Sequence, residues 1–338
     1  MADTRRLSPI VERAMVFACA LAALAVSQID RPPTEPSPLA VMRPRAFAAG
    51  ASLNAFGNSR GVRLRFALPN NSVEFPIEVS GDPSEMTYEW QSLRDSLVVT
   101  ASRSIEGALV IAPNRPGFYQ LVLRRGAERR VVREPALAVM VPFTDKIGSS
   151  LNGYHIGTYV AERLTMDYER PSGFLEVHPE DVNLMASTHL RLGDFITHDG
   201  QQSVWPKYVA LNPHLLDKLE LVLGQIGGRA IVRLDSAEAH EVAFDVHSGF
   251  RTPAHNRRVP RAASDSRHQY GDAADVAIDA DGDGRVTLKD QVLVTRAVDL
   301  VEDAHPELVG GLGIYVSHRY AAPYVHIDVR GIRTRWKG

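Results

Sequence analysis

Residues 46–142 alternate apolar and polar positions over short stretches. In residues 62–68, for example, Val62, Leu64, Phe66 and Leu68 alternate with two arginines. Similar apolar stretches lie at residues 75–79, 97–99, 108–111, 118–123 and 136–141. A period of two is typical of β-strands, and turn residues such as Gly and Asn separate the stretches. About seven short strands without a helix predict an all-β sandwich for residues 46–142.

Helical periodicity appears only later in the chain. Asn212 followed by Pro213 is a helix-start signal, and apolar residues then recur on one face up to Gly227. A second helix is expected over residues 288–305, where Pro306 ends it. Its apolar stripe is Leu293, Ala297, Leu300, Val301 and Ala304. With a late strand at residues 324–329, these helices predict an α+β domain over residues 188–338, and residues 143–187 form a connecting segment without an assigned role.

The first 45 residues have the composition of a targeting segment and a linker. Three arginines, at positions 5, 6 and 13, precede an apolar run over residues 14–26, which predicts a signal peptide at residues 1–25. The run is shorter than the roughly 20 residues that span a bilayer, so a retained anchor is the weaker interpretation. The proline-rich residues 26–45 predict an extended linker. We therefore expect a periplasmic or secreted protein of the cell envelope, without a spanning segment in the mature chain.

Composition narrows the possible partners and chemistry. The formal net charge is -2, which gives no reason to expect nucleic acid or an anionic membrane surface as a partner. Cys19 is the single cysteine and lies inside the apolar run. The mature chain then has no thiol, which excludes disulfides and cysteine catalysis. A group of arginines flanks Gly126, which favours a solvated hairpin turn over a ligand patch; these are Arg124, Arg125, Arg129, Arg130 and Arg133.

Polar residues also interrupt three stretches in which a core strand would be apolar. If residues 274–278 form a strand, Val276 and Ile278 face the core and Asp275 faces the opposite way. The same alternation places His326 and Asp328 together on one face of the last strand. The three stretches are residues 248–253, 266–275 and 324–328.

Residues 266–275 read Ser-Arg-His-Gln-Tyr-Gly-Asp-Ala-Ala-Asp. This pattern resembles the zinc D-alanyl-D-alanine carboxypeptidase family of metallopeptidases, whose fold is shared with vancomycin-resistance D,D-dipeptidases and hedgehog domains. The resemblance covers residues 188–336 and implies that His268, Asp275 and His326 bind zinc. Such a ligand set agrees with hydrolytic zinc sites, which take three nitrogen or oxygen ligands and keep a fourth position for water.

The resemblance also bears on the catalytic groups. Arg251 stands where the family has an arginine that holds a substrate carboxylate or carbonyl oxygen, and a structural salt bridge is the alternative. Many members place Glu three residues before the last zinc histidine, but this chain has Pro323 there. The general base is therefore unassigned. Asp328 suits that role and a supporting role for the histidine equally well, and His318 is a more distant candidate.

A second metal site is predicted from residues 279–290. Oxygen ligands fall at the loop positions that calcium requires, with Gly284 at the sharp turn. The predicted ligands are Asp279, Asp281, Asp283, Arg285 through its backbone, Thr287 and Asp290. An acidic glycine-rich turn without metal is the alternative. Because the loop begins four residues after Asp275, we expect bound calcium to organise the zinc site.

Together these features predict a zinc-dependent peptidase that remodels the cell wall. We expect it to hydrolyse peptide bonds of peptidoglycan stem peptides or cross-links, as a D,D-carboxypeptidase or an endopeptidase. The alternative is a non-catalytic zinc-containing module that binds peptidoglycan or protein, which the hedgehog resemblance and Pro323 permit. A purely structural calcium-stabilised protein ranks last. In either case, we expect the β-sandwich to present the catalytic module to the cell wall or to an envelope protein partner.

Overall fold

The computed structural model describes residues 59–75, 85–105, 109–164, 170–227, 230–238, 241–316 and 323–338. The predicted signal peptide, the linker and Cys19 lie outside the described residues, as do His318 and most of the strand expected at residues 75–79. Within the described ranges, no helix is both long and apolar enough to cross a membrane.

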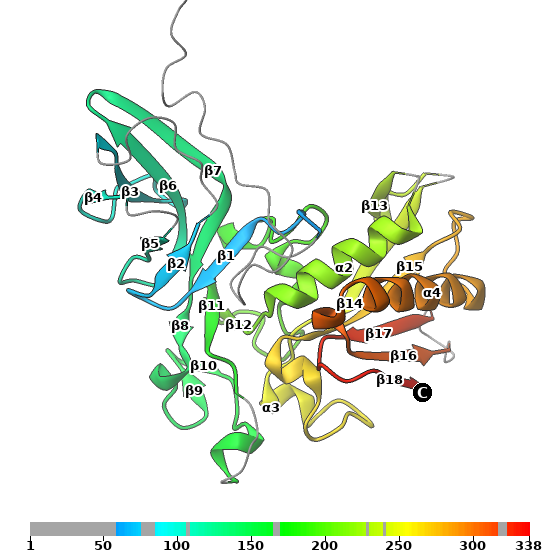
Figure 1. The fold of residues 1–338 in the computed structure, drawn as a ribbon. Coiled ribbons are helices and arrows are strands. Elements are labelled where there is room, and N and C mark those ends of the chain that lie inside the picture. Colours follow the sequence, from blue (N-terminus) through cyan, green and yellow to red (C-terminus); the bar gives the residue numbers. More distant parts are fainter. Residues whose placement is uncertain are drawn as a thin grey trace, which may run out of the picture.

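The N-terminal module is a five-stranded sheet with a two-stranded ribbon (Figure 1). The sheet has the order β1-β7-β6-β3-β4, with β1 (Leu64–Ala67), β7 (Glu128–Val139), β6 (Gly117–Arg125), β3 (Thr87–Ser92) and β4 (Arg103–Ser104). The ribbon pairs β2 (Ser72–Glu74) with β5 (Leu109–Ile111). Val73, Val110 and Trp90 belong to one buried cluster that joins ribbon and sheet. The module is thus all-β as expected, while the full two-sheet sandwich stays a prediction.

The strands of this module differ from the predicted ones at two places. Residues 97–99 do not form a named strand: Leu97 is 62% exposed, and their pairing with β3 is limited to an isolated bridge between Gln91 and Val98 with backbone hydrogen bonds to Ser92 and Trp90. The prediction was wrong because three consecutive apolar residues next to a turn have the same pattern as a short strand. Conversely, the pattern does not predict β3, because its buried Glu89 interrupts the apolar positions. Glu89 is accommodated by an ion pair of 2.7 Å with Arg124 on β6.

The hairpin between β6 and β7 turns at Gly126, whose φ of 56° suits glycine. Arg124, Arg125, Arg129 and Arg130 lie at the ends of its two strands, with Arg124 opposite Arg129 and Arg125 opposite Glu128. This confirms the predicted hairpin.

Residues 141–211 link this module to the C-terminal domain. They contain a three-stranded sheet, β12-β11-β8, and a two-stranded hairpin. Their bounds are β8 (Val141–Pro142), β9 (Ser150–Leu151), β10 (Tyr154–His155), β11 (Gly173–Val177) and β12 (Lys207–Val209). The rings of Phe143 and Phe174 stack at 5.9 Å, and Tyr159 reaches Tyr270 of the C-terminal domain at 5.9 Å. One buried cluster runs from Val62 through this linking region to the last sheet.

The C-terminal domain is a six-stranded sheet covered on one face by two helices (Figure 1). The strand order is β13-β14-β15-β17-β16-β18, with β13 (Ile231–Arg233), β14 (Val242–Ser248), β15 (Ala273–Asp279), β17 (Tyr324–Asp328), β16 (Gly311–Tyr315) and β18 (Thr334–Lys337). The helices are α2 (Pro213–Ile226), α4 (Leu288–Ala304) and the short α3 (Pro253–Asn256). Single 3-10 turns are η3 (Phe143–Asp145), η4 (Val160–Glu162), η5 (Pro179–Asp181), η6 (Leu192–Phe195), η7 (Leu234–Ser236), η8 (Arg267–Tyr270) and η9 (Pro306–Leu308). The predicted α+β architecture is confirmed.

Helix α2 matches its prediction in detail. It begins at Pro213, and the side chain of Asn212 accepts a hydrogen bond of 2.9 Å from the backbone N–H of His214. Helix α4 has the expected extent, but its predicted stripe is partly wrong. Ala297 and Val301 are buried, whereas Leu293 and Leu300 are 37% and 48% exposed and Ala304 is also exposed.

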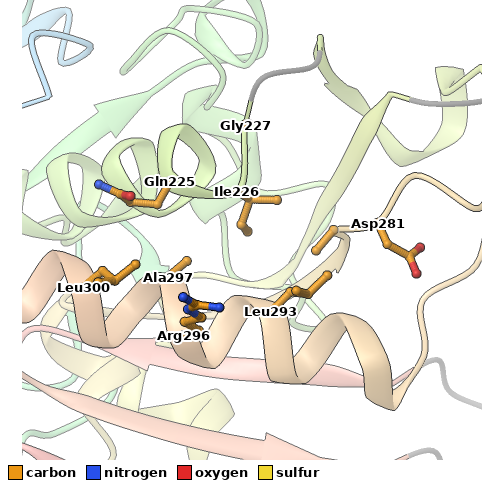
Figure 2. A pocket seen from close by; sticks show the side chains of 9 residues that line it. Gln225, Ile226, Gly227, Asp281, Leu293, Arg296, Ala297 and Leu300 are labelled. Atoms are coloured by element: carbon orange, nitrogen blue, oxygen red, sulfur yellow. The ribbon is translucent and has the colours of Figure 1, made fainter.

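The buried face of α4 differs from the predicted apolar stripe because it includes polar residues. Gln291 and Glu302 occupy buried positions and have hydrogen-bond partners there, so the buried face contains polar residues that an apolar stripe ignores. Leu293 and Leu300 instead line a groove between α2 and α4, together with Ile226 (Figure 2). This groove lies on the helical side of the sheet. The candidate site, with Asp275 and His326, lies on the opposite face of the sheet.

Candidate metal centre

His268, Asp275 and His326 come from three segments, and their side chains meet. Asp275 on β15 is the register partner of His326 on β17, and η8 supplies His268. His268 Nε2 lies 3.2 Å from Asp275 Oδ1 and 3.1 Å from His326 Nδ1. His326 Nδ1 lies 3.0 Å from Asp275 Oδ1. The three residues are 1%, 6% and 6% exposed, so two nitrogens and one oxygen converge in a buried site.

Glycine turns bring the first two residues together. Gly271 has a φ of 73° and ends η8, where the chain turns into β15. A Cβ at Gly271 would lie 2.1 Å from the carbonyl oxygen of Ala210, so a side chain is excluded there. This explains the glycine between His268 and Asp275 in the sequence pattern: it lets a short turn lead directly into the strand that carries the carboxylate.

The second nitrogen of each imidazole is occupied. His268 Nδ1 donates to the carbonyl oxygen of Gly249 at 2.7 Å, and His326 Nε2 donates to Asp328 Oδ2 at 3.0 Å. These bonds fix the ring orientations. When both rings are neutral, the lone pairs of His268 Nε2 and His326 Nδ1 point to the place where Asp275 Oδ1 also lies, whereas a doubly protonated ring donates to that oxygen instead. Two neutral imidazoles and one carboxylate, each held from behind, are a donor set that suits zinc.

The electrostatics of the cluster favour a cation. Although burial opposes ionisation, hydrogen bonds and charge from His268 and His326 hold the pKa of Asp275 well below its usual range. Burial lowers the pKa of His268. For His326, burial acts in the same direction, but Asp275 and Asp328 outweigh it and raise the pKa. The carboxylate is therefore ionised throughout the ordinary pH range.

Arg251 reaches the same cluster. Its Nη2 contacts Asp275 Oδ2, and its Nε donates to Ser248 Oγ at 2.7 Å. The side chain is 14% exposed, so the guanidinium lies at the rim of the buried site. Arg251 therefore forms the structural salt bridge that was the alternative prediction for this residue. Binding of a substrate carboxylate or carbonyl oxygen by Arg251 stays a prediction.

Asp328 is completely buried and bonds to the side of the His326 ring that faces away from Asp275. Its carboxylate also accepts from the backbone N–H of Gly311 at 2.7 Å and from Arg330 Nε at 2.9 Å. Every one of these contacts orients His326 or shields the carboxylate. The geometry thus favours support of the histidine over the role of general base, for which Pro323 offers no group and His318 lies outside the described residues.

An aromatic wall, which the sequence pattern did not predict, lies beside His326. The ring of Trp336 on β18 lies 5.1 Å from that of His326, and its indole N–H donates to the Tyr315 hydroxyl at 3.0 Å. A Cβ on Gly313 would lie 2.4 Å from the indole, so the glycine allows Trp336 to lie across β16. The Gly-x-Gly at the start of β16 was the available signal, because glycine inside a strand marks a close approach.

The predicted calcium loop connects β15 to α4. Asp279 accepts from the backbone N–H groups of Asp283 and Gly284 at 3.1 and 2.7 Å, and Asp281 pairs with Lys289 at 2.6 Å. Carboxylate oxygens of Asp279, Asp281 and Asp283 lie within 4.8 Å of one another. Among the other predicted ligands, Arg285 donates its backbone N–H to Asp283. Thr287 and Asp290 form the capping box of α4. Calcium itself stays a prediction.

A buried His-Asp-His cluster on one face of the sheet defines a candidate metallohydrolase domain. Residues 234–300 match the family model described as peptidase M15. The match includes Arg251, His268 and Asp275, and it confirms the resemblance to zinc D-alanyl-D-alanine carboxypeptidases. Residues 234–300 thus resemble peptidases of the M15 family, which supports a metallopeptidase. No curated protein matches the chain.

Proposed function

We propose that the protein is a zinc peptidase that hydrolyses peptide bonds in peptidoglycan stem peptides or cross-links. The observation that carries this proposal is the meeting of His268 Nε2, Asp275 Oδ1 and His326 Nδ1 within 3.2 Å of one another. The family match over residues 234–300 supports the reaction class. D,D-carboxypeptidase and endopeptidase activity are both compatible with this site.

The chain's residues have distinct proposed roles. His268, Asp275 and His326 would hold zinc, which supplies Lewis-acid activation of an amide carbonyl and of water. Arg251 is held by Ser248 and Asp275 at the rim of the site, where its remaining donors suit a substrate carboxylate or carbonyl oxygen. Trp336 and Tyr315 form one wall of the site beside His326.

Calcium binding by residues 279–290 is part of the proposal. Three carboxylates gather there, and the loop leaves the strand that carries Asp275. A cation held among them would fix the end of β15 and the start of α4. Export by the signal peptide at residues 1–25, and a partner for the β module in the cell envelope, are proposed on the sequence alone.

The competing function is a zinc-containing binding module without hydrolysis. Pro323, in place of the expected glutamate, is the observation that keeps it in consideration. The peptidase family match favours the enzyme.

Digestion of purified peptidoglycan separates the two functions. The mature protein is incubated with zinc, and the products are identified by mass spectrometry. We expect new peptide fragments that disappear with His268→Ala and persist with His178→Ala, a histidine paired with Glu176 outside the cluster. Intact peptidoglycan after treatment with folded, zinc-loaded protein would favour the binding module.

A further inference from the structure

The two helices behind the sheet carry a buried ion pair. Lys218 on α2 and Glu302 on α4 are 0% and 1% exposed, and Nζ lies 2.8 Å from Oε1. The other oxygen of Glu302, Oε2, pairs with Arg335 at 2.6 Å and Arg333 at 3.0 Å near the surface. Burying two charges has a desolvation cost that their attraction often fails to recover, and apolar residues of similar volume are frequently as stable or more stable. Stability alone is therefore a poor explanation for this pair.

Both members of the pair also bond to the backbone next to the metal centre. Lys218 Nζ donates to the carbonyl oxygen of Asp328 at 2.7 Å. Glu302 Oε1 accepts from the backbone N–H of Gly310 at 3.1 Å, directly before β16. The ion pair thus binds β17 and the start of β16 at the level of Asp328.

These two backbone segments lie in close contact. A Cβ on Gly310 would lie 1.9 Å from the Asp328 carbonyl oxygen, and one on Gly311 would lie 2.4 Å from Asp328 Oδ2. The N–H of Gly311 donates to the Asp328 carboxylate at 2.7 Å, and that carboxylate holds His326 Nε2 at 3.0 Å. A displacement of the Asp328 backbone would therefore be passed directly to the imidazole.

We propose that Lys218 and Glu302 are positioning residues of the metal centre, which fix the backbone at Asp328 and thereby orient His326 for zinc. This inference rests on the proposed zinc site. Neither residue touches the three ligand residues in the described contacts, so both act through Asp328. Groups behind metal ligands contribute to affinity because they restrict the ligand to the orientation that the metal requires.

The test compares zinc affinity with folding stability. Lys218→Met removes the donor to Asp328 and keeps most of the side-chain volume. Lys207→Met is the matched control, since Lys207 is also buried, at 4% exposed, but packs over Tyr154 and Trp205 outside the metal centre. Zinc dissociation constants are measured by competition with a chromophoric chelator, and the absorption spectrum of the cobalt-loaded protein reports ligand geometry.

We expect Lys218→Met to weaken zinc binding by about tenfold and to change the cobalt spectrum. Lys218→Arg, which keeps a donor, should recover part of the affinity, and Lys207→Met should bind zinc as the wild type does. Glu302→Gln provides a second variant if Lys218→Met does not fold. Its single amide oxygen can still accept from Lys218 and Gly310, while the NH2 group that replaces Oε2 loses the pairs with Arg335 and Arg333, so a smaller loss of zinc affinity is expected.

Wild-type zinc affinity in the folded Lys218 or Glu302 variants, with only a lower melting temperature, would overturn the inference and leave a purely structural pair. Failure of the wild-type protein itself to bind zinc would instead refute the proposed metal centre. The two failures are therefore distinguishable.

Discussion

Asp328 and His326 lie two residues apart on β17, and the carboxylate bonds to the ring nitrogen that faces away from the other ligand residues. Asp328 Oδ2 is 3.0 Å from His326 Nε2, whereas His326 Nδ1 is 3.0 Å from Asp275 Oδ1. The imidazole thus separates Asp328 from the point at which the ligand atoms converge. A carboxylate in this position sets the tautomer and basicity of a metal ligand.

Asp328→Asn tests that role. The amide keeps the size of the side chain but loses the negative charge that orients the His326 imidazole and raises its basicity. Zinc affinity should therefore fall by roughly 10- to 100-fold. Asp303→Asn, at an exposed ion pair with Arg333, is the control and should leave zinc affinity unchanged. Unchanged zinc affinity combined with lost turnover in Asp328→Asn would point to a base and contradict our interpretation.

Zinc removal should lower the melting temperature. A ligand present at about 1,000 times its dissociation constant stabilises the native state by about 4 kcal/mol. Differential scanning fluorimetry with and without zinc measures this difference. His268→Ala should abolish the zinc-dependent shift and His178→Ala should retain it; a shift that survives His268→Ala would place the metal elsewhere.

Zinc affinity should decrease as the pH falls through the pKa of His326. Burial opposes protonation, but Asp275 and Asp328 raise that pKa above the ordinary value of 6.5, so the ring of the metal-free protein keeps its proton to a higher pH. Zinc and the proton compete for Nδ1. In the metal-free protein the stabilising contribution of the protonated ring is present at low pH and is lost as the pH rises through the raised pKa.

Calorimetric titration with zinc over a pH series measures this competition. We expect proton release on binding that decreases above the pKa of His326. His268 should contribute little near neutral pH, because burial lowers its pKa. Proton-free zinc binding just above pH 6.5 would contradict the raised pKa.

Gly313→Ala tests the aromatic wall. The added methyl group would lie 2.4 Å from the Trp336 indole, and such overpacking costs about 1–3 kcal/mol. Gly224→Ala on α2 is a matched control, because its Cβ would meet nothing within 4 Å and alanine is favoured in a helix by up to about 1 kcal/mol. Denaturant unfolding should therefore show opposite signs for the two variants. Equal effects would mean that Trp336 moves freely.

Calcium should raise the melting temperature of the zinc-loaded protein. Neutralising Asp283, one of three clustered carboxylates, by Asp283→Asn should reduce the shift, whereas Asp303→Asn should not. The measurement uses a calcium-selective chelator with zinc retained. If melting temperature and activity are the same with and without calcium, the acidic turn has no metal role.

The sequence predicted the grouping of His268, Asp275 and His326 better than it predicted the fold around them. His268, Asp275 and their turn form a local pattern with fixed spacing, and alternation alone placed His326 on the correct face. The buried face of α4 was harder to predict, because Glu302 is buried among cations from distant segments: Lys218, 84 positions earlier, and Arg333 and Arg335 near the C-terminus. The same holds for β3, where Glu89 depends on Arg124. Such pairs are formed by tertiary structure and leave no periodic signal.

The continuous core described above, which runs from Val62 to Ile327, also limits how the protein reaches its substrate. A shared apolar core restricts hinge motion between modules and couples their unfolding. If the β module binds a surface or partner, that attachment sets both the height and the direction of the metal centre. The metal centre would then reach only those peptide bonds that lie at a fixed distance from the point where the β module is attached. The attachment would thus add to the selectivity that the site itself provides.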